Sequence, residues 1–314
     1  MRSSKGYKRS YETYLATDLY GKLTQKNTRG LTQTPTSPLT GLVGGFSFAD
    51  SDAATYAAAI EGDGVTLSDD QKQAIDTFYT TGKSEGWYSD IARLYLTVWG
   101  QASANSRCLV SGTQGTFNGS IGHNAGYIDN PSYSGFMDTG SSAVAKGLSL
   151  GSQGFGFLQV APDSSSGGCP MGGVDFYNPG SEGHGAQQDS LSIMSFHHDA
   201  ITGSSKVSTS TGISGKRIYS TIEFSGDLYL DERTSSGFSG VGFTSGGAYQ
   251  DFSSDSTDLI MAINVYFGTN PTASNYWGGQ MGAAFYHSSS DSSFNEYFTL
   301  GLKNLWEGCT GLSL

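Results

Sequence analysis

Apolar residues recur at helical spacing in consecutive stretches of the first third of the chain. The alanine-rich segment 51–60 follows a candidate capping residue, Asp50 or Ser51, and ends before two glycines. The next segment begins at Ser68, where the order Ser-Asp-Asp-Gln is typical of a capping box, and ends at Gly82. Each stretch therefore predicts a short helix with one apolar face.

A third stretch, residues 87–99, carries four apolar residues at helical spacing: Ile91, Leu94, Tyr95 and Val98. It predicts a third short helix. Together the three stretches predict a small helical module over residues 46–106.

From about residue 107 the pattern changes to short apolar or alternating runs, separated by Gly, Ser, Asn and Asp. This spacing is typical of two packed antiparallel sheets joined by tight turns. The runs are residues 154–160, 174–177, 191–196, 218–224, 227–230, 259–267 and 280–286. We therefore predict a mainly β fold, a β-sandwich over residues 107–314.

The chain is expected to end in an amphipathic helix. Ser293 and Glu296 have the spacing of a second capping box. The apolar stripe that follows consists of Phe294, Tyr297, Phe298, Leu302, Leu305 and Trp306. This closing helix would pack on the sandwich.

Composition agrees with a β-rich domain. The 314 residues include 45 glycines, 12% are aromatic, and only 14% are charged. Charged residues make up roughly a quarter of an average soluble domain, so helical bundles and coiled coils are poor fits. Aromatic residues suit pleated strands, and glycine suits the tight turns between them.

Charge is distributed unevenly. The formal net charge is 17 − 28 = −11, but residues 1–31 carry seven basic and two acidic side chains, which gives +5 there and −16 for the remainder. The basic residues are Arg2, Lys5, Lys8, Arg9, Lys22, Lys26 and Arg29. The acidic total argues against nucleic-acid binding by the whole chain, whereas the basic arm could attach to an acidic partner surface or to nucleic acid. The alternative is a solvated terminus.

The arm also has an apolar face, made of Tyr11, Tyr14, Leu15 and Leu19 at helical spacing. Residues 32–45, with two prolines and three glycines, are typical of an extended linker. We therefore treat residues 1–45 as a basic N-terminal arm that ends in a linker.

Three cysteines, Cys108, Cys169 and Cys309, are widely spaced and form no C-x-x-C motif. They indicate buried free thiols, which fits assembly in a reducing cytosol. No apolar run is long enough to cross a bilayer, and no apolar segment follows the basic start as in a signal peptide. We expect neither membrane insertion nor ordinary export.

Candidate catalytic carboxylates cluster in one run, T-I-E-F-S-G-D-L-Y-L-D-E-R. On a strand, Asp227 and Asp231 share a face while Glu232 points the opposite way. A retaining glycosidase needs two carboxyls about 5–5.5 Å apart, which positions i and i+4 of one strand overshoot. We therefore expect Glu223 and these three acids to be solvated strand-edge charges, and the protein not to be an enzyme.

Metal binding and cofactors are not expected. The tightest histidine pair, His197 and His198, would face opposite sides of a strand, so both rings could not bind one metal without a bend. A loosely spaced acidic loop, Asp251, Asp255 and Asp258, leaves calcium as a weaker alternative. No phosphate-binding loop or nucleophile elbow occurs in the sequence.

Glycan contact is a further candidate. Sugar rings stack on exposed aromatic side chains, and short polar side chains add hydrogen bonds. The loop Asn275-Tyr276-Trp277-Gly278 has this composition, and Tyr229 beside Asp231 is a second candidate. An exposed loop tryptophan could equally be a contact between subunits.

Two long motifs resemble virion proteins of tailed bacteriophages that carry a concanavalin A-like or laminin G-like jelly-roll sandwich. They are DAATYAAAIEGDGVTLSDDQKQAIDTFYTTGKSEGWYSDI and GTNPTASNYWGGQMGAAFYHSSSDSSFNEYFTLGLKNLW. The resemblance covers roughly residues 46–308 and none of the arm. It implies a jelly-roll topology and a structural or adhesive role, and it carries over no catalytic residues.

We therefore expect a structural virion component, such as a capsid decoration protein or a head or tail fibre. It would assemble in the host cytoplasm, dock on other virion proteins through residues 1–45, and display the jelly roll, as a homo-oligomer such as a trimer. The alternatives are a glycan-binding adhesin and, less well supported, a polysaccharide-degrading enzyme.

Overall fold

A computed structural model describes residues 46–314, apart from 143–147, 149–151, 165–167, 169, 175–182, 191–192, 198–205, 210–211, 225–226, 246–257 and 262–276. Contacts divide the chain into two compact units, Met1–Gly45 and Phe46–Leu314. The second unit is called the body below. All residues of the basic arm lie outside the described part.

Two antiparallel sheets form the body. Among the described residues the first sheet has eight strands in the order β13-β12-β11-β6-β15-β4-β3, and β1 pairs with β15 beside β4. Its strands are β1 (Ile91–Leu96), β3 (Gly122–Asn124), β4 (Tyr127–Asp129), β6 (Gly154–Ala161), β11 (Arg217–Phe224), β12 (Asp227–Thr234), β13 (Gly237–Ser245) and β15 (Gln280–His287). We call it the central sheet.

The opposite sheet has seven strands among the described residues, in the order β10-β9-β8-β7-β14-β5-β2. They are β2 (Thr116–Asn118), β5 (Phe136–Ser142), β7 (Met171–Val174), β8 (Gly183–Ser190), β9 (Ile193–His197), β10 (Lys206–Ser208) and β14 (Asp258–Met261). The fold is therefore mainly β, a jelly-roll sandwich with N-terminal helices and a C-terminal helix, which confirms the fold predicted from the sequence.

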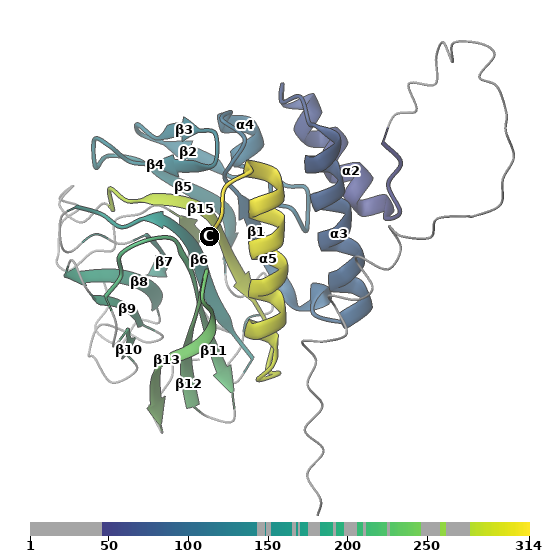
Figure 1. Ribbon diagram of the computed structural model, residues 1–314. Helices are drawn as coiled ribbons and strands as arrows, with labels where there is room; N and C mark the ends of the chain where they lie inside the picture. The colour runs from purple at the N-terminus through teal and green to yellow at the C-terminus, as the bar shows by residue number, and fades with distance from the viewer. Residues whose placement is uncertain are drawn as a thin grey trace, which may run out of the picture. The chain divides into compact units, whose positions relative to one another are not determined.

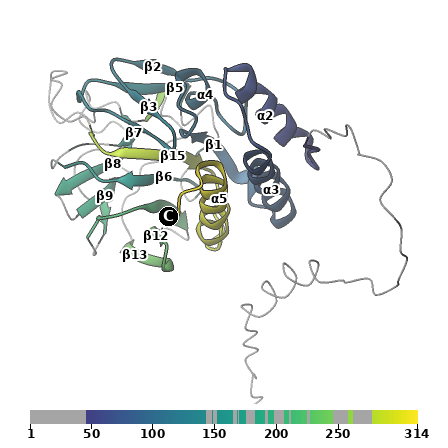
Figure 2. The same ribbon diagram turned by 45° about the horizontal axis from the view of Figure 1, so that its top comes forward.

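The central sheet is covered on both faces. Figures 1 and 2 show helices α3 and α5 on one side of strands β6 and β15, and strands β7–β9 on the other. Seven of the eight residues of β6, β11 and β15 are buried in each strand. One hydrophobic cluster joins the helices to this sheet, and a second fills the space between the two sheets.

The third predicted helix is wrong. After a 3₁₀ turn, η1 (Tyr88–Asp90), the chain forms strand β1, antiparallel to β15. Leu94 and Leu96 face the helices, whereas Tyr95 faces the sandwich. Because both faces of the strand are buried, apolar residues fall at helical spacing without forming a helix. A short helix, α4 (Ala102–Asn105), follows.

The other helices form as predicted. Helix α2 (Ser51–Gly62) is capped by the Asp50 carboxylate, and α3 (Asp69–Glu85) begins with the full capping box of Ser68 and Gln71. Helix α5 (Phe294–Thr310) closes the body, but its predicted capping box is wrong because the Ser293 side chain caps no N–H group. The Asp291 carboxylate holds that serine instead, at 2.9 Å from its N and 2.8 Å from its Oγ.

The Trp87 side chain packs between the two long helices, α3 and α5. Its ring lies 5.1 Å from that of Phe78 on α3 and 5.9 Å from that of Phe298 on α5. A glycine faces the indole from each helix: a Cβ added at Gly82 would lie 2.6 Å from the ring, and one at Gly301 would lie 2.9 Å from it. The two glycines therefore make the room that the indole occupies.

Cys108 and Cys309 are buried free thiols, as predicted, and Cys169 lies outside the described residues. Burial raises the pKa of the Cys309 thiol. No helix in the described part of the chain is both long and apolar enough to span a bilayer.

The close packing of Gly82 against Trp87 leads to a stability prediction. We expect Gly82→Ala to lower the free energy of unfolding by about 1–3 kcal/mol, because the new methyl group overlaps a ring that is packed on all sides. The control is Gly62→Ala, where a Cβ meets no atom within 4 Å. It should raise stability by about 0.5–1 kcal/mol through helix propensity. Urea unfolding measures both, and equal effects of the two substitutions would contradict the packing.

Candidate functional site

The predicted glycan loop does not expose its tryptophan. Trp277 is 1% exposed, and its indole N–H donates to Oε1 of Gln188 at 2.9 Å. Its ring also packs edge-on against Phe157 at 5.7 Å. The expectation of an exposed Trp277 is therefore wrong, because the side chain fills the core between the two sheets. Tyr276 lies outside the described residues.

The second predicted position, Tyr229, lies in a row of three aromatic side chains on the outer face of the central sheet. Its ring centroid is 5.0 Å from that of Phe243 and 6.4 Å from that of Phe224. Phe243 is 54% exposed, and the other two rings are half-buried. We call Phe224, Tyr229 and Phe243 the aromatic strip. It crosses β11, β12 and the edge strand β13.

Strand register explains the strip. Tyr229 on β12 is paired with Phe243 on β13 and with Ile222 on β11, so these side chains share one face. Ile222 is buried, whereas Phe243 lies on the edge strand and stays open to solvent. Phe243 was missed from the sequence because its alignment opposite Tyr229 follows from the register of β13.

Asp231, the other predicted residue, lies two positions along β12 on the same outer face. Its Oδ2 accepts a hydrogen bond of 2.7 Å from Nδ2 of Asn295, at the start of α5. Oδ1 of Asn295 in turn accepts a 2.6 Å bond from the Ser220 hydroxyl. Burial raises the pKa of the Asp231 carboxyl, the Asn295 bond lowers it, and the nearby Glu296 raises it, for a net increase.

Arg233 lies two residues after Asp231 on β12 and, like Asp231, contacts α5. Its Nε donates to Oγ1 of Thr299 at 2.9 Å, and Nη2 donates to the Glu296 carbonyl at 2.5 Å. The guanidinium lies 5.2 Å from the ring centre of Phe238. The arrangement thus places the exposed ring of Phe243 and the half-buried ring of Tyr229 on the same face as the half-buried Asp231 carboxylate. Such a combination suits a ligand with apolar faces and hydroxyl groups.

The remaining candidate acids are not brought together with Asp231. Glu232 points into the sandwich, where it is 4% exposed and forms a 2.5 Å ion pair with Arg217. Glu223 is also buried and accepts a 2.6 Å bond from Gln153. The expectation of solvated charges is wrong for these two, because each has a structural partner. Asp227 is half-buried.

His287 occupies a structural position in the core. The His287 ring is fully buried, with Nε2 2.9 Å from the Thr221 carbonyl and Nδ1 accepting from the Ser289 N–H. Burial lowers its pKa to about 4, so the ring is neutral at pH 7. His197 ends β9, while His198 lies outside the described residues.

No group of three or more His, Cys, Asp or Glu side chains within the described ranges is arranged to hold a metal ion. Of the acids proposed for calcium, Asp258 begins β14, and Asp251 and Asp255 lie outside those ranges.

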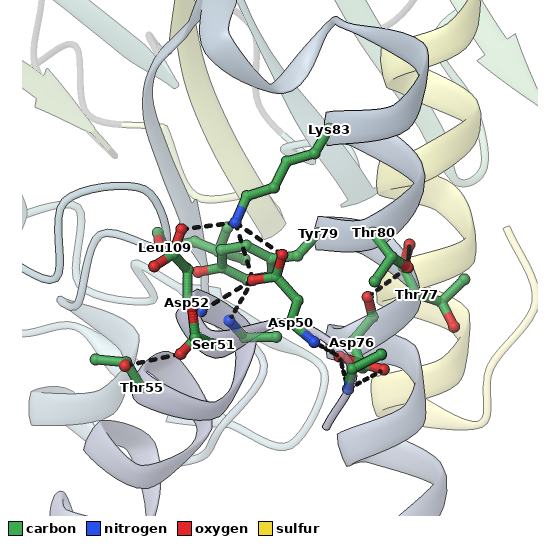
Figure 3. Close-up of polar contacts among 12 residues, drawn as sticks. Asp50, Ser51, Asp52, Thr55, Asp76, Thr77, Tyr79, Thr80, Lys83 and Leu109 are labelled. Atoms are coloured by element: carbon green, nitrogen blue, oxygen red, sulfur yellow. Dashed lines mark hydrogen bonds and ion pairs between the residues drawn. The ribbon is translucent and has the colours of Figure 1, made fainter. Parts of the chain in front are cut away.

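A second feature of functional interest is the place where the body begins. The Asp76 carboxylate on α3 accepts the backbone N–H of Ala49 at 3.0 Å and that of Asp50 at 2.9 Å. Figure 3 shows this contact at the start of α2. Charge-assisted bonds of this kind hold the first residues of the body on α3.

Lys83, in the last turn of α3, contacts the same junction. Its ammonium lies 2.8 Å from Asp50 and 2.6 Å from Asp52, and Figure 3 shows the side chain reaching toward both carboxylates. It also lies 5.5 and 5.4 Å from the ring centres of Tyr79 and Tyr88. Burial acts to raise the pKa of Asp50, but Lys83 and two backbone N–H groups bring it below its ordinary value.

Comparison with known proteins yields only distant similarities. No protein-family model matches the sequence, and a search of curated proteins found no match. The carbohydrate-binding module CBM40 of the Ruminococcus gnavus IT-sialidase is similar at 10% identity over 47% of this chain and 82% of that one, with a TM-score of 0.34. A legume lectin-like domain from Entamoeba histolytica matches at 10% identity over 55% and 89%, with a TM-score of 0.34.

A sialidase from Trypanosoma rangeli is similar at 12% identity over 74% of this chain, with a TM-score of 0.46. This chain spans 39% of the length of that sialidase. At these identities and TM-scores the similarities carry no information on ligand, partner or reaction.

The raised pKa of Asp231 generates a prediction about pH. Because the folded protein favours the protonated carboxyl, the ionised form costs stability above the folded pKa, and this cost disappears as the pH falls below the unfolded value. Asp231→Asn should therefore raise the free energy of unfolding at pH 8. The gain should shrink toward zero at pH 3. Urea unfolding of both proteins from pH 3 to 8 gives this difference, and a gain that grows on acidification would refute the assignment.

Proposed function

We propose that this protein is a noncatalytic structural component of a tailed-bacteriophage virion, a capsid decoration protein or a head or tail fibre. It docks through residues 1–45 and displays the jelly-roll body. The observation that carries the proposal is that contacts and charge divide the chain at one place. Residues 32–45 carry no charge, so the arm as a whole has +5 and the body −16.

The contacts where the body begins also support a docking arm joined to a displayed body. Asp76 and Lys83 tie the first turn of α2 to α3, and α3 packs against α5 and the central sheet. A pull on the arm is thus resisted by the core of the body rather than by one loop. The sequence resemblance to jelly-roll virion proteins, which spans the body, supports the same role.

The carboxylates support a noncatalytic role. Asp231 and Glu232 lie on opposite faces of β12, and each is bound to a side chain of the fold, Asn295 and Arg217 respectively. Hydrolysis of a glycoside needs two carboxyls on either side of one bond. Neither acid is free to take part in such a pair.

In the proposed mechanism, assembly takes place in the host cytoplasm. The positive arm meets an acidic patch on other virion proteins, and burial of its apolar face, Tyr11, Tyr14, Leu15 and Leu19, supplies affinity. Copies of the chain would form a homo-oligomer such as a trimer, with the acidic bodies outward.

Replacing the seven basic residues of the arm with glutamine tests the docking role. We expect incorporation into particles to fall about tenfold or more, because the charges that orient the arm are gone. A control with glutamine at Lys72 and Lys303, two basic residues of the body, should be incorporated normally. Quantitative immunoblots of purified particles measure copy number. Undiminished incorporation of the arm variant would count against docking through the arm, and release of reducing ends from a polysaccharide by the wild type would refute a noncatalytic role.

A second candidate function is glycan binding, which the aromatic strip favours. Tyr229 on β12 and Phe243 on the edge strand β13 present adjacent rings, with Asp231 on the same face of β12 as an acceptor. Sugar rings place their C–H faces on such surfaces. In a fibre, the strip would contact a host polysaccharide.

Phe243→Ala and Tyr229→Ala should each weaken binding to a glycan about tenfold, since each removes one stacking platform. The matched control is Tyr297→Ala, which removes an aromatic ring on α5 that is 49% exposed and makes no ring contact with the strip. A glycan array followed by titration gives the affinities. An array without a hit, or equal binding by all three variants, would remove this candidate.

A further inference from the structure

One buried arginine in the described part of the body has no acidic partner. Arg93 on β1 is 5% exposed, and no carboxylate of the described residues lies within 4.0 Å of its guanidinium. Nη1 donates two long bonds to neutral oxygens, at 3.2 Å to Ser111 Oγ and 3.4 Å to the Ala92 carbonyl. Nε is buried and has no hydrogen-bond partner.

The other two buried arginines of the described residues have the partners that Arg93 lacks. Arg217 is paired with Glu232, and Arg233 donates from both Nε and Nη2 into α5. A buried cation without a counterion is costly, and proteins normally supply an anion or a set of acceptors. Arg93 has neither.

A second unsatisfied donor lies beside it. Arg93 and Tyr95 are paired with Tyr286 and Ala284 of β15, so both face the space between the two sheets. The Tyr95 hydroxyl is buried and forms no direct hydrogen bond, and the neighbouring side chain that interacts with it is Arg93 itself. Burial raises the pKa of this phenol, which keeps it protonated and able to donate.

Arg93 contacts a turn at the surface of the body. Ser111 is exposed, and its hydroxyl lies 2.8 Å from that of Thr113, which is also exposed. The turn is closed by a 2.8 Å bond from the Cys108 N–H to the Thr113 carbonyl, with Gly112 in the left-handed region at φ 70°. Arg93 therefore reaches from the interior to a rim of surface hydroxyls.

We propose that Arg93, Tyr95 and Ser111 form a binding site for the carboxylate of a small ligand. Nη1 already donates to protein oxygens, so Nε and Nη2 remain to bind a ligand. These two donors lie on one edge of the guanidinium and match the two oxygens of a planar carboxylate. The phenol and the serine hydroxyl supply further donors. The body carries −16, which repels polyanions and favours a ligand with a single charge. The site is separate from the aromatic strip and does not depend on the virion role.

Thermal unfolding of the full chain at constant ionic strength tests the proposal, with sodium glucuronate, acetate and inorganic phosphate as probes. Glucuronate and acetate should raise the melting temperature progressively, because a ligand that binds only the folded state stabilises it. Isothermal titration with glucuronate then gives the dissociation constant. A melting temperature indifferent to both carboxylates, or a response to phosphate alone, would overturn the assignment.

Two variants locate the site. Arg93→Gln should weaken glucuronate binding about tenfold or more. Tyr95→Phe should weaken it several-fold while leaving folding intact, since the hydroxyl that it removes forms no direct hydrogen bond and interacts with Arg93 of the same site. The matched control, Arg233→Gln, should retain wild-type affinity. Equal affinity of Tyr95→Phe and the wild type, together with an unchanged response of Arg93→Gln, would place any binding elsewhere and refute the proposal.

Discussion

The structure depends on burying the central sheet on both faces. One face of β6, β15 and β11 packs on the opposite sheet, and the other is covered by α3 and α5. Close approach on the helical face requires small residues: a Cβ at Gly282 would lie 2.5 Å from the Trp306 indole, and one at Gly308 would lie 2.5 Å from Ala74. Because both faces are occupied, the surfaces left for binding lie at the rim. The aromatic strip crosses the edge strand β13, Arg93 lies on β1, and the arm joins at α2.

This two-sided burial also explains what could be predicted of the fold from the sequence. Strands with one polar face alternate, as β12 does, and the run containing Asp227 and Leu230 was recognised as a strand on that basis. Strand β1 has almost no polar face, so its apolar residues matched a helical period by chance. Local capping was predicted at Ser68, where the motif acts alone, but not at Ser293, where the Asp291 carboxylate competes for the serine.

The candidate site could be predicted only in part. Tyr229 and Asp231 were recognised from composition, and both lie on the outer face as strand alternation requires. Composition does not show how deeply a side chain is buried, so Trp277 and Glu232 were expected at the surface. In the structure both are buried, Trp277 bound to Gln188 and Glu232 to Arg217. Pairing between distant segments decides such cases. The burial of Arg93 could have been predicted, because it lies within an apolar run. A charged residue in such a run is buried whenever both faces of the strand are covered.

Native-state hydrogen exchange tests the central claim most directly, because it reports the free energy of opening for each element. If helices and sheet share one core, amides of α3 and α5 exchange only through global unfolding, with the same free energy as those of β6 and β15. Amides of the edge strand β13 exchange through smaller openings. Exchange of α5 through a low-energy opening, while β6 and β15 stay protected, would contradict the account and make the helices an appendage of the sandwich.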